Sequence, residues 1–195
     1  NTQPAILTVS YAIYETLKNE FNFDFSSFKF FAGHSLGEYS ALVCSDSLKF
    51  EDALYLLHQR GTAMQEAVPV GLGSMVAILG TKIDLIKEII KLNLSKDDVC
   101  EIANDNAEGQ VIISGKKDSV ERVEKVLKEK KIKSIQLKVS APFHCTLMKP
   151  AAEYMTNKIN DIEFKIPKHK IISNVTADSI TDPEIIKKLL IKQIY

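Results

Sequence analysis

This 195-residue sequence lacks any excess of charge, which already excludes some classes of protein. Its 25 Lys and Arg residues are matched by 25 Asp and Glu residues. That balance excludes a protein whose whole surface attracts nucleic acid or an anionic membrane, although a local basic patch is compatible with it. No apolar run approaches the ~20 residues of a membrane span. We therefore expect a soluble globular protein with neither nucleic acid nor a membrane as a partner.

Cysteine is also scarce, and the three present have spacings that fit neither a zinc site nor a CxxC pair. The four histidines lack the spacing of metal ligands. We expect free thiols in a reducing cytoplasm and no metal. No signal peptide is visible, and the first residues are typical of the interior of a longer chain.

Arginine is nearly absent, since Arg60 and Arg122 are the only two among the 25 basic residues. Arg122 lies in a charged stretch and is expected on the solvated surface. Arg60 lies among apolar residues, where a guanidinium can form two parallel hydrogen bonds with a carboxylate. The residues alone leave two interpretations of Arg60 open: a helix-surface salt bridge, or a site for a substrate with a free carboxylate.

Apolar periodicity predicts an α/β protein. A helix over 3–18, capped by Thr2, places an apolar stripe on one face, made of Ile6, Val9, Ile13 and Leu17. Further helices are expected at 36–44, 50–67, 148–159 and from Pro183 onward, and strands at 28–32 and 170–173.

Between these parts the pattern changes to strand, helix, strand, strand, helix, strand. The expected strands are 75–79, 99–103, 110–114 and 132–139, and the expected helices are 83–92 and 119–130. This βαββαβ order is ferredoxin-like. It predicts a subdomain over 71–139, inserted into a larger domain made of 1–70 and 140–195.

The strongest chemical signal is G-x-S-x-G at Gly33, Ser35 and Gly37, directly after an apolar run and before a helix. A serine at such a strand-to-helix turn projects its hydroxyl from a strained backbone. The glycines allow the tight turn and close approach of substrate. The new helix directs its first amides, starting with the Leu36 N–H, toward a developing oxyanion. The pattern therefore predicts Ser35 as a nucleophile.

A serine nucleophile needs a base, and His144 is the best-placed histidine because it follows a strand and precedes a helix. His34, adjacent to Ser35, is expected to support the turn. Cys145 is expected to be a buried free thiol. No acid clearly completes a triad, and Glu38 is expected to point away from the serine. A Ser-His pair oriented by a backbone carbonyl is chemically sufficient.

Several segments together are similar to one known family, in order and spacing, over essentially the whole chain. They are TQP at 2–4, GHSLGEYSA at 33–41, QRG with MQ at 59–65, NDN with GQ at 104–110, APFH at 141–144 and LMKP at 147–150. They closely resemble malonyl-CoA:acyl carrier protein transacylases of type II fatty acid synthesis.

The resemblance implies a ping-pong transfer in which Ser35, activated by His144, takes a malonyl group from malonyl-CoA. The phosphopantetheine thiol of acyl carrier protein then accepts it. The resemblance also implies that the Leu36 amide stabilises the oxyanion, that Arg60 holds the malonyl carboxylate, and that Gln3 lines the pocket. It implies an α/β-hydrolase-like core with a ferredoxin-like subdomain. The coenzyme A thioester is a substrate, so no separate cofactor is expected, and we expect a monomer.

Three other functions remain open on the residues. A G-x-S-x-G thioesterase or lipase-like hydrolase would have no use for a buried cation at Arg60. A polyketide-synthase acyltransferase would take malonyl or methylmalonyl units, and Phe143 resembles the malonyl-selective form, whose ring leaves little room for an α-methyl group. A carrier-docking module without catalysis is disfavoured because Ser35, His144 and Arg60 are all present.

The sequence departs from the family pattern at both ends and in one loop. The family's Gly-Gln-Gly-Ser-Gln stretch, a second source of oxyanion donors, would precede residue 1, and its Gly-Pro-Gly region would follow Tyr195. We therefore expect the isolated 195 residues to be less active than a version extended at both ends. Glu108 stands where the family usually has proline, which predicts a local change of loop only.

Overall fold

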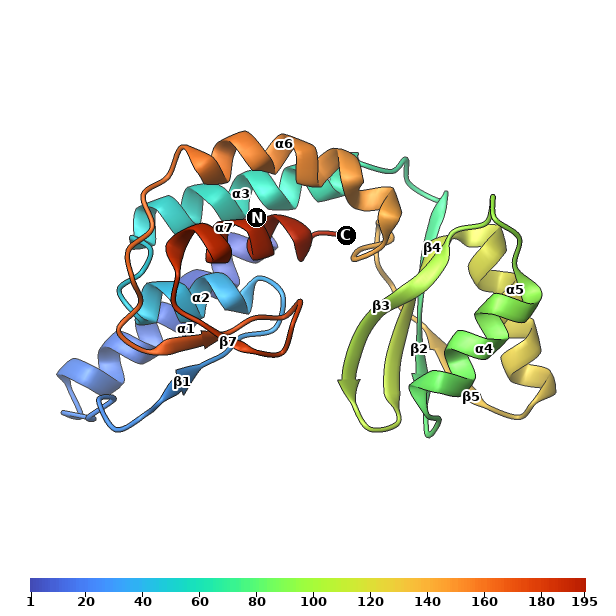
Figure 1. Cartoon of the computed structure of the whole chain (residues 1–195), viewed down its shortest axis with the longest axis horizontal. Helices are drawn as coiled ribbons and strands as arrows, with labels where there is room; N and C mark the ends of the chain where they lie inside the picture. Colours follow the sequence, from blue (N-terminus) through green and yellow to red (C-terminus); the bar gives the residue numbers. More distant parts are fainter. The chain divides into compact units, whose positions relative to one another are not determined.

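The structure, a computed structural model, describes all 195 residues (Figure 1). It is a mixed α/β protein with seven α-helices and two separate β-sheets. The chain divides into two compact units, the first made of residues 1–62 and 153–193 and the second of 63–152 and 194–195. Each unit contains one of the two sheets. None of the helices combines the length and apolarity of a membrane-spanning segment.

The first unit packs helices around a small three-stranded sheet. Its segments belong to α1 (Thr2–Asn19), β1 (Phe30–Phe31), α2 (Gly37–Cys44), α3 (Phe50–Glu66), α6 (Lys149–Asn160), β6 (Lys170–Ile172), β7 (Ser179–Ile180) and α7 (Pro183–Lys192). Strand β6 lies in the centre of the sheet, parallel to β1 and antiparallel to β7. Asp182 caps the start of helix α7, because its carboxylate accepts from the amides of Glu184 and Ile185, and Pro183 occupies the first turn.

Helix α1 is confirmed, but its predicted apolar stripe is not part of the core. Its four residues are 36–60% exposed, and they are Ile6, Val9, Ile13 and Leu17. The helix instead buries Leu7 and turns its tyrosines inward, since Tyr11 stacks on Phe50 and Tyr14 contacts Phe25. The side of α1 that faces the rest of the first unit therefore carries Leu7 and these two half-buried rings. The predicted cap is also wrong, because the cap position is Asn1 and its side chain makes no capping bond.

The second unit contains the strand-helix-strand-strand-helix-strand block in the predicted order. Its elements are β2 (Gly73–Leu79), α4 (Ile83–Asn93), β3 (Cys100–Ala107), β4 (Gln110–Lys116), α5 (Lys117–Glu129) and β5 (Lys133–Gln136), followed by a short 3-10 turn, η1 (Thr146–Met148). The sheet is antiparallel with strand order β3-β4-β2-β5. Helices α4 and α5 cover one of its faces (Figure 1).

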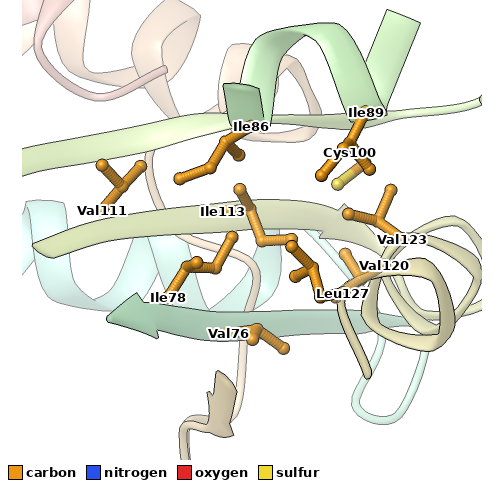
Figure 2. Packing of buried hydrophobic residues seen from close by; sticks show 10 residues of the cluster. All are labelled: Val76, Ile78, Ile86, Ile89, Cys100, Val111, Ile113, Val120, Val123 and Leu127. Atoms are coloured by element: carbon orange, nitrogen blue, oxygen red, sulfur yellow. The ribbon is translucent and has the colours of Figure 1, made fainter. Parts of the chain in front are cut away.

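The core of the second unit forms between that face and the two helices, as Figure 2 shows. Alternate residues of β2 and β4 point into it, among them Val76, Ile78 and Ile113, all fully buried. They meet Ile86 of α4 and Leu127 of α5. Because side chains alternate along a strand, the residues between them point to the opposite face. There Met75, Ala77 and Ile112 form a smaller cluster.

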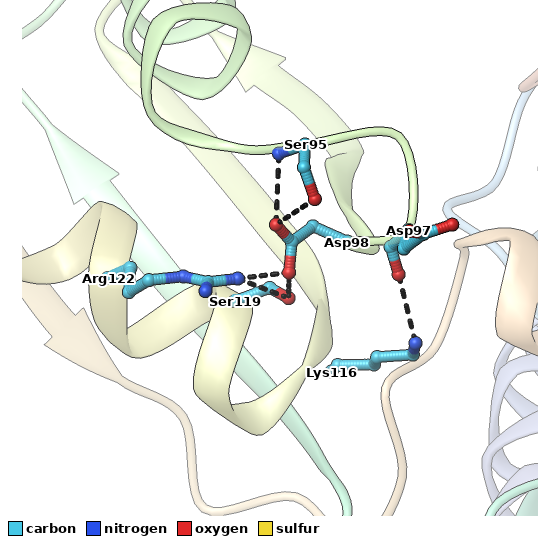
Figure 3. Close-up of polar contacts among 6 residues, drawn as sticks. All are labelled: Ser95, Asp97, Asp98, Lys116, Ser119 and Arg122. Carbon is cyan, nitrogen blue, oxygen red and sulfur yellow. Dashed lines mark hydrogen bonds and ion pairs between the residues drawn. The ribbon is translucent and has the colours of Figure 1, made fainter.

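Arg122 lies in a polar cluster at the start of α5 (Figure 3). Asp98 accepts hydrogen bonds from the Ser95 amide and hydroxyl and from the Ser119 hydroxyl, and it pairs with Arg122. These bonds, first of all those from Ser95, hold the pKa of Asp98 below its usual range. The Arg122 side chain is 52% exposed, which confirms the expectation of a solvated residue.

Candidate active site

Ser35 lies on a sharp turn between β1 and α2. Its φ of +51° is in the left-handed region, which is strained for a residue with a side chain. The turn is very tight, because a Cβ added at Gly33 would lie 2.0 Å from the Gly37 carbonyl oxygen. Residue 33 must therefore be glycine, whereas Gly37 has open space around the corresponding position.

Asn174 brackets this turn from the neighbouring strand. Its Oδ1 accepts from the Ser35 N–H at 2.7 Å, and its Nδ2 donates to the Gly33 carbonyl at 2.7 Å. Asn174 follows β6, which pairs in parallel with β1. Its side chain therefore links the two segments that follow these paired strands. The Asn174 N–H donates in turn to Glu38 Oε2 at 3.1 Å.

The first amides of α2 lie beside the serine. The Gly37 N–H donates to the His34 carbonyl at 2.8 Å, and the Glu38 N–H donates to the Ser35 carbonyl at 3.1 Å. The Leu36 N–H donates to no backbone carbonyl. This amide, next to the nucleophile and at the positive end of the helix dipole, is therefore open to an oxyanion.

Arg60, on α3, is 1% exposed and reaches the serine. Its Nη2 donates to Ser35 Oγ at 3.0 Å and to Gln193 Oε1 at 2.9 Å, while its Nη1 donates to Gln3 Oε1 at 2.7 Å. It also lies over the Tyr39 ring, 5.9 Å from its centre. No carboxylate lies within 4.0 Å, so the surface salt-bridge interpretation is wrong. Burial lowers the pKa of this guanidinium.

Glu38 is fully buried and takes part in the same network. Its Oε2 accepts from Gln193 Nε2 at 2.7 Å as well as from Asn174. The Gln193 Nε2 also donates to the Ser35 carbonyl at 3.2 Å. Glu38 is thus linked to the serine turn through two amides instead of simply pointing away from it. Burial raises its pKa, although these hydrogen bonds and Arg60 oppose the rise.

His144 and Phe143 belong to the second unit, in the loop before η1. His144 has a φ of +58°, so its backbone is strained like that of Ser35. The loop is held from both sides. Pro142 lies so close to Gly73 that an added Cβ there would come within 2.3 Å of it, and Glu101 accepts from the Thr146 amide at 2.9 Å.

The rest of that loop is packed inward. Phe143 packs against the cluster of Met75, Ala77 and Ile112. Cys145 is a fully buried free thiol, as expected, and burial raises its pKa. This thiol is therefore inert as a nucleophile.

No cluster of metal-ligating side chains lies among these residues, and the cavity of the first unit lies elsewhere. No three His, Cys, Asp or Glu side chains lie where they could hold an ion. A cavity of about 710 Å³ in the first unit is lined by aromatic and lysine side chains of α1, the 23–30 segment and 168–170, and it contains none of the candidate residues. We place the candidate site at Ser35 because of the strained serine turn and the buried Arg60 beside it.

Comparison with known proteins identifies the family of the chain. Residues 1–190 match the acyl transferase domain family. The chain belongs to that family. The malonyl CoA-acyl carrier protein transacylases of Staphylococcus aureus strain COL and Bacillus subtilis strain 168 are each 43% identical to it over its full length. The chain spans only 62% and 61% of these two relatives.

Solved acyltransferase structures are equally similar. The acyl carrier protein S-malonyltransferase from Vibrio cholerae is 41% identical, with a TM-score of 0.94. The match covers all of this chain and 62% of the Vibrio cholerae chain. A malonyl-transacylase described in complex with its type II polyketide-synthase acyl carrier protein is 39% identical, with a TM-score of 0.93. This match also covers all of the present chain and 62% of the transacylase chain. The resemblance inferred from the motifs is thereby confirmed.

Two residues that contact Ser35 in the candidate site were not predicted from the sequence. Gln193 and Asn174 lie 158 and 139 residues after Ser35, and each contacts it through a single side-chain amide. A lone amide at such a distance forms no motif, so the sequence held no signal for either. Ser35, Leu36, Arg60 and Gln3, by contrast, are brought together in the first unit.

Proposed function

We propose that this chain carries the acyl-loading site of a malonyl-CoA:acyl carrier protein transacylase. The observation that carries the proposal is the contact between Arg60 and Ser35. A buried guanidinium without a carboxylate partner donates to the hydroxyl of a strained serine at 3.0 Å. Such a pair suits an acyl group that bears both a reactive carbonyl and a free carboxylate, as malonyl does.

The reaction proceeds in two half-reactions through malonyl-Ser35. Ser35 Oγ forms a bond to the thioester carbonyl carbon while His144 takes its proton. The Leu36 N–H stabilises the oxyanion. The C–S bond then breaks, and coenzyme A leaves with the proton. The phosphopantetheine thiol of acyl carrier protein attacks the malonyl ester by the reverse sequence, and Ser35 regains its proton.

Substrate selection is assigned to three side chains. Arg60 holds the malonyl carboxylate, and Gln3, which accepts from Arg60 at 2.7 Å, lines the pocket and orients the guanidinium. Phe143 limits room at the α-carbon and so favours malonyl over methylmalonyl. A polyketide-type acyltransferase is the second candidate, favoured by the similarity to a malonyl-transacylase described with a polyketide carrier protein.

The proposed fold pairs an α/β-hydrolase-like core, formed by 1–70 and 140–195, with a ferredoxin-like subdomain over 71–139. The parallel pairing of β1 with β6 at the serine turn supports the first part. The strand order β3-β4-β2-β5 supports the second. The proposed protein is a cytoplasmic monomer whose partners are malonyl-CoA and acyl carrier protein, with no bound cofactor. Its three free thiols suit a reducing compartment.

The test compares kcat/KM for malonyl-CoA and acetyl-CoA in wild type, Arg60→Ala and Arg60→Lys. Acetyl offers a methyl group and leaves the buried charge unpaired, which costs about 2–5 kcal/mol. Arg60→Ala is expected to lose malonyl transfer together with the preference for malonyl. Arg60→Lys is expected to be only partly active, because an ammonium lacks the two-pronged geometry. An unchanged malonyl-to-acetyl ratio in Arg60→Ala would show that Arg60 is purely structural.

A further inference from the structure

All three hydrogen-bond acceptors around the Arg60 guanidinium are neutral oxygens. They are Gln3 Oε1, Ser35 Oγ and Gln193 Oε1, at 2.7–3.0 Å. The Arg60 Nε–H is buried without any acceptor. Buried charges in proteins are normally paired, since an unpaired one costs free energy. The site therefore fixes the position of Arg60 without neutralising its charge.

A carboxyl group that would neutralise Arg60 lies nearby, but Gln193 separates the two. Gln193 caps the C-terminal end of α7 and is 6% exposed. Its Oε1 accepts from Arg60, while its Nε2 donates to Glu38 Oε2 and to the Ser35 carbonyl. The amide can have only this orientation, because arginine is solely a donor and a backbone carbonyl solely an acceptor.

We propose that the Gln193 side chain is a positioning and specificity residue that reserves the charge of Arg60 for the carboxylate of the acyl group. A glutamate here would have the same shape but would form a permanent ion pair, which an incoming carboxylate would have to displace. The neutral amide orients the guanidinium and supports the serine turn. It also lies between Glu38 and Arg60, so that the two do not form an ion pair. The inference rests on the proposed function and extends it to acyl thioesters with a free carboxylate.

The first test is Gln193→Glu, assayed in the full chain as the ratio of kcat/KM for malonyl-CoA to that for acetyl-CoA. The ratio is expected to fall at least about tenfold, because close buried charge pairs couple by more than one decade in affinity. The fall is expected to come mainly from a higher KM for malonyl-CoA. The matched control is Gln59→Glu, the same change next to Arg60 on α3. Gln59 Oε1 accepts from the Tyr154 hydroxyl at 2.5 Å, a bond that a carboxylate keeps, so its ratio is expected to stay unchanged.

Two further variants keep the inference falsifiable, since Gln193→Glu brings two carboxyl groups together and can destabilise the fold. The double variant Glu38→Gln/Gln193→Glu moves the carboxylate toward Arg60 with no change in net charge. Gln3→Glu introduces an anion at Nη1 from the opposite side. Both are expected to lose malonyl preference while Ser35 still reacts with phenylmethylsulfonyl fluoride, a neutral serine reagent.

The outcomes separate the two proposals. If Ser35 stays reactive and the malonyl-to-acetyl ratio is retained in the double variant and in Gln3→Glu, the role of Gln193 is overturned. A loss of overall activity with an unchanged ratio also overturns it, because that is the effect of a merely structural residue. If Arg60→Ala keeps the wild-type ratio, the proposed function of Arg60 fails instead, whatever the Gln193 variants do.

Discussion

At the scale of single residues, the serine turn depends on how little space surrounds it. Ser35 adopts φ +51°, and the chain closes so tightly that Gly33 and the Gly37 carbonyl nearly touch. The motif G-x-S-x-G predicted the tight turn, and Ser35 as its nucleophile stays a prediction. It did not distinguish the two glycines, which have different physical roles.

Substituting those glycines separates the roles. Gly33→Ala forces a Cβ to within 2.0 Å of backbone and is expected to destabilise the protein by roughly 2–4 kcal/mol. Gly37→Ala meets nothing within 4 Å and begins a helix, so it is expected to be neutral or stabilising by up to about 1 kcal/mol. Denaturant unfolding measures both. Equal destabilisation by the two changes would contradict the geometry of the turn.

Glu38 makes stability depend on pH in a defined direction. Burial raises the pKa of Glu38 in the folded protein above its ordinary value. Between the unfolded and the folded pKa, folding takes up a proton, so stability falls as pH rises through that window. Glu38→Gln removes this titration. The unfolding free energy of wild type relative to Glu38→Gln is expected to decrease from acid pH toward neutrality. A difference that is flat or increases with pH would show that hydrogen bonding to the carboxylate, not burial, dominates.

At the scale of elements, most helices and strands could be predicted because their apolar period is clear. The exceptions have physical causes. The α1 helix buries Leu7 and packs its half-buried tyrosines against other rings, while its aliphatic stripe stays exposed, which single-helix periodicity does not reveal. The two-residue strand β7 was not predicted, because it exists only through its pairing with β6.

The link between β6 and the serine turn is an element-scale feature that can be tested. Asn174→Ala removes the bonds to the Ser35 N–H and the Gly33 carbonyl, so kcat for acyl transfer is expected to fall by about tenfold or more while KM changes little. Asn93→Ala is the control, because Asn93 also bonds a backbone carbonyl, that of Ile89 at 2.8 Å, but within α4. A loss of kcat shared by the two variants would remove the special role of Asn174.

At the scale of the whole molecule, several of the candidate residues that the sequence singled out lie together in the first unit, whereas some of their contacts had no sequence signal. Ser35, Arg60 and Gln3 could be predicted, because the first two stand in a motif or in unusual isolation and all three match a known family. Gln193 and Asn174 could not, because the amides that bind the turn come from the far end of the chain. The match to the acyl transferase domain family extends over residues 1–190 and confirms the family that the motifs indicated.

The central claim is that Ser35 carries the acyl group, and the most direct test is the mass of the protein after exposure to malonyl-CoA. Wild type is expected to gain one malonyl group, located by peptide mapping on Ser35. Ser35→Ala is expected to gain none, and His144→Ala to load roughly 10²–10⁴-fold more slowly, the usual effect of losing a general base. Malonyl bound to Ser35→Ala, or mapped to another residue of the wild type, would contradict the account.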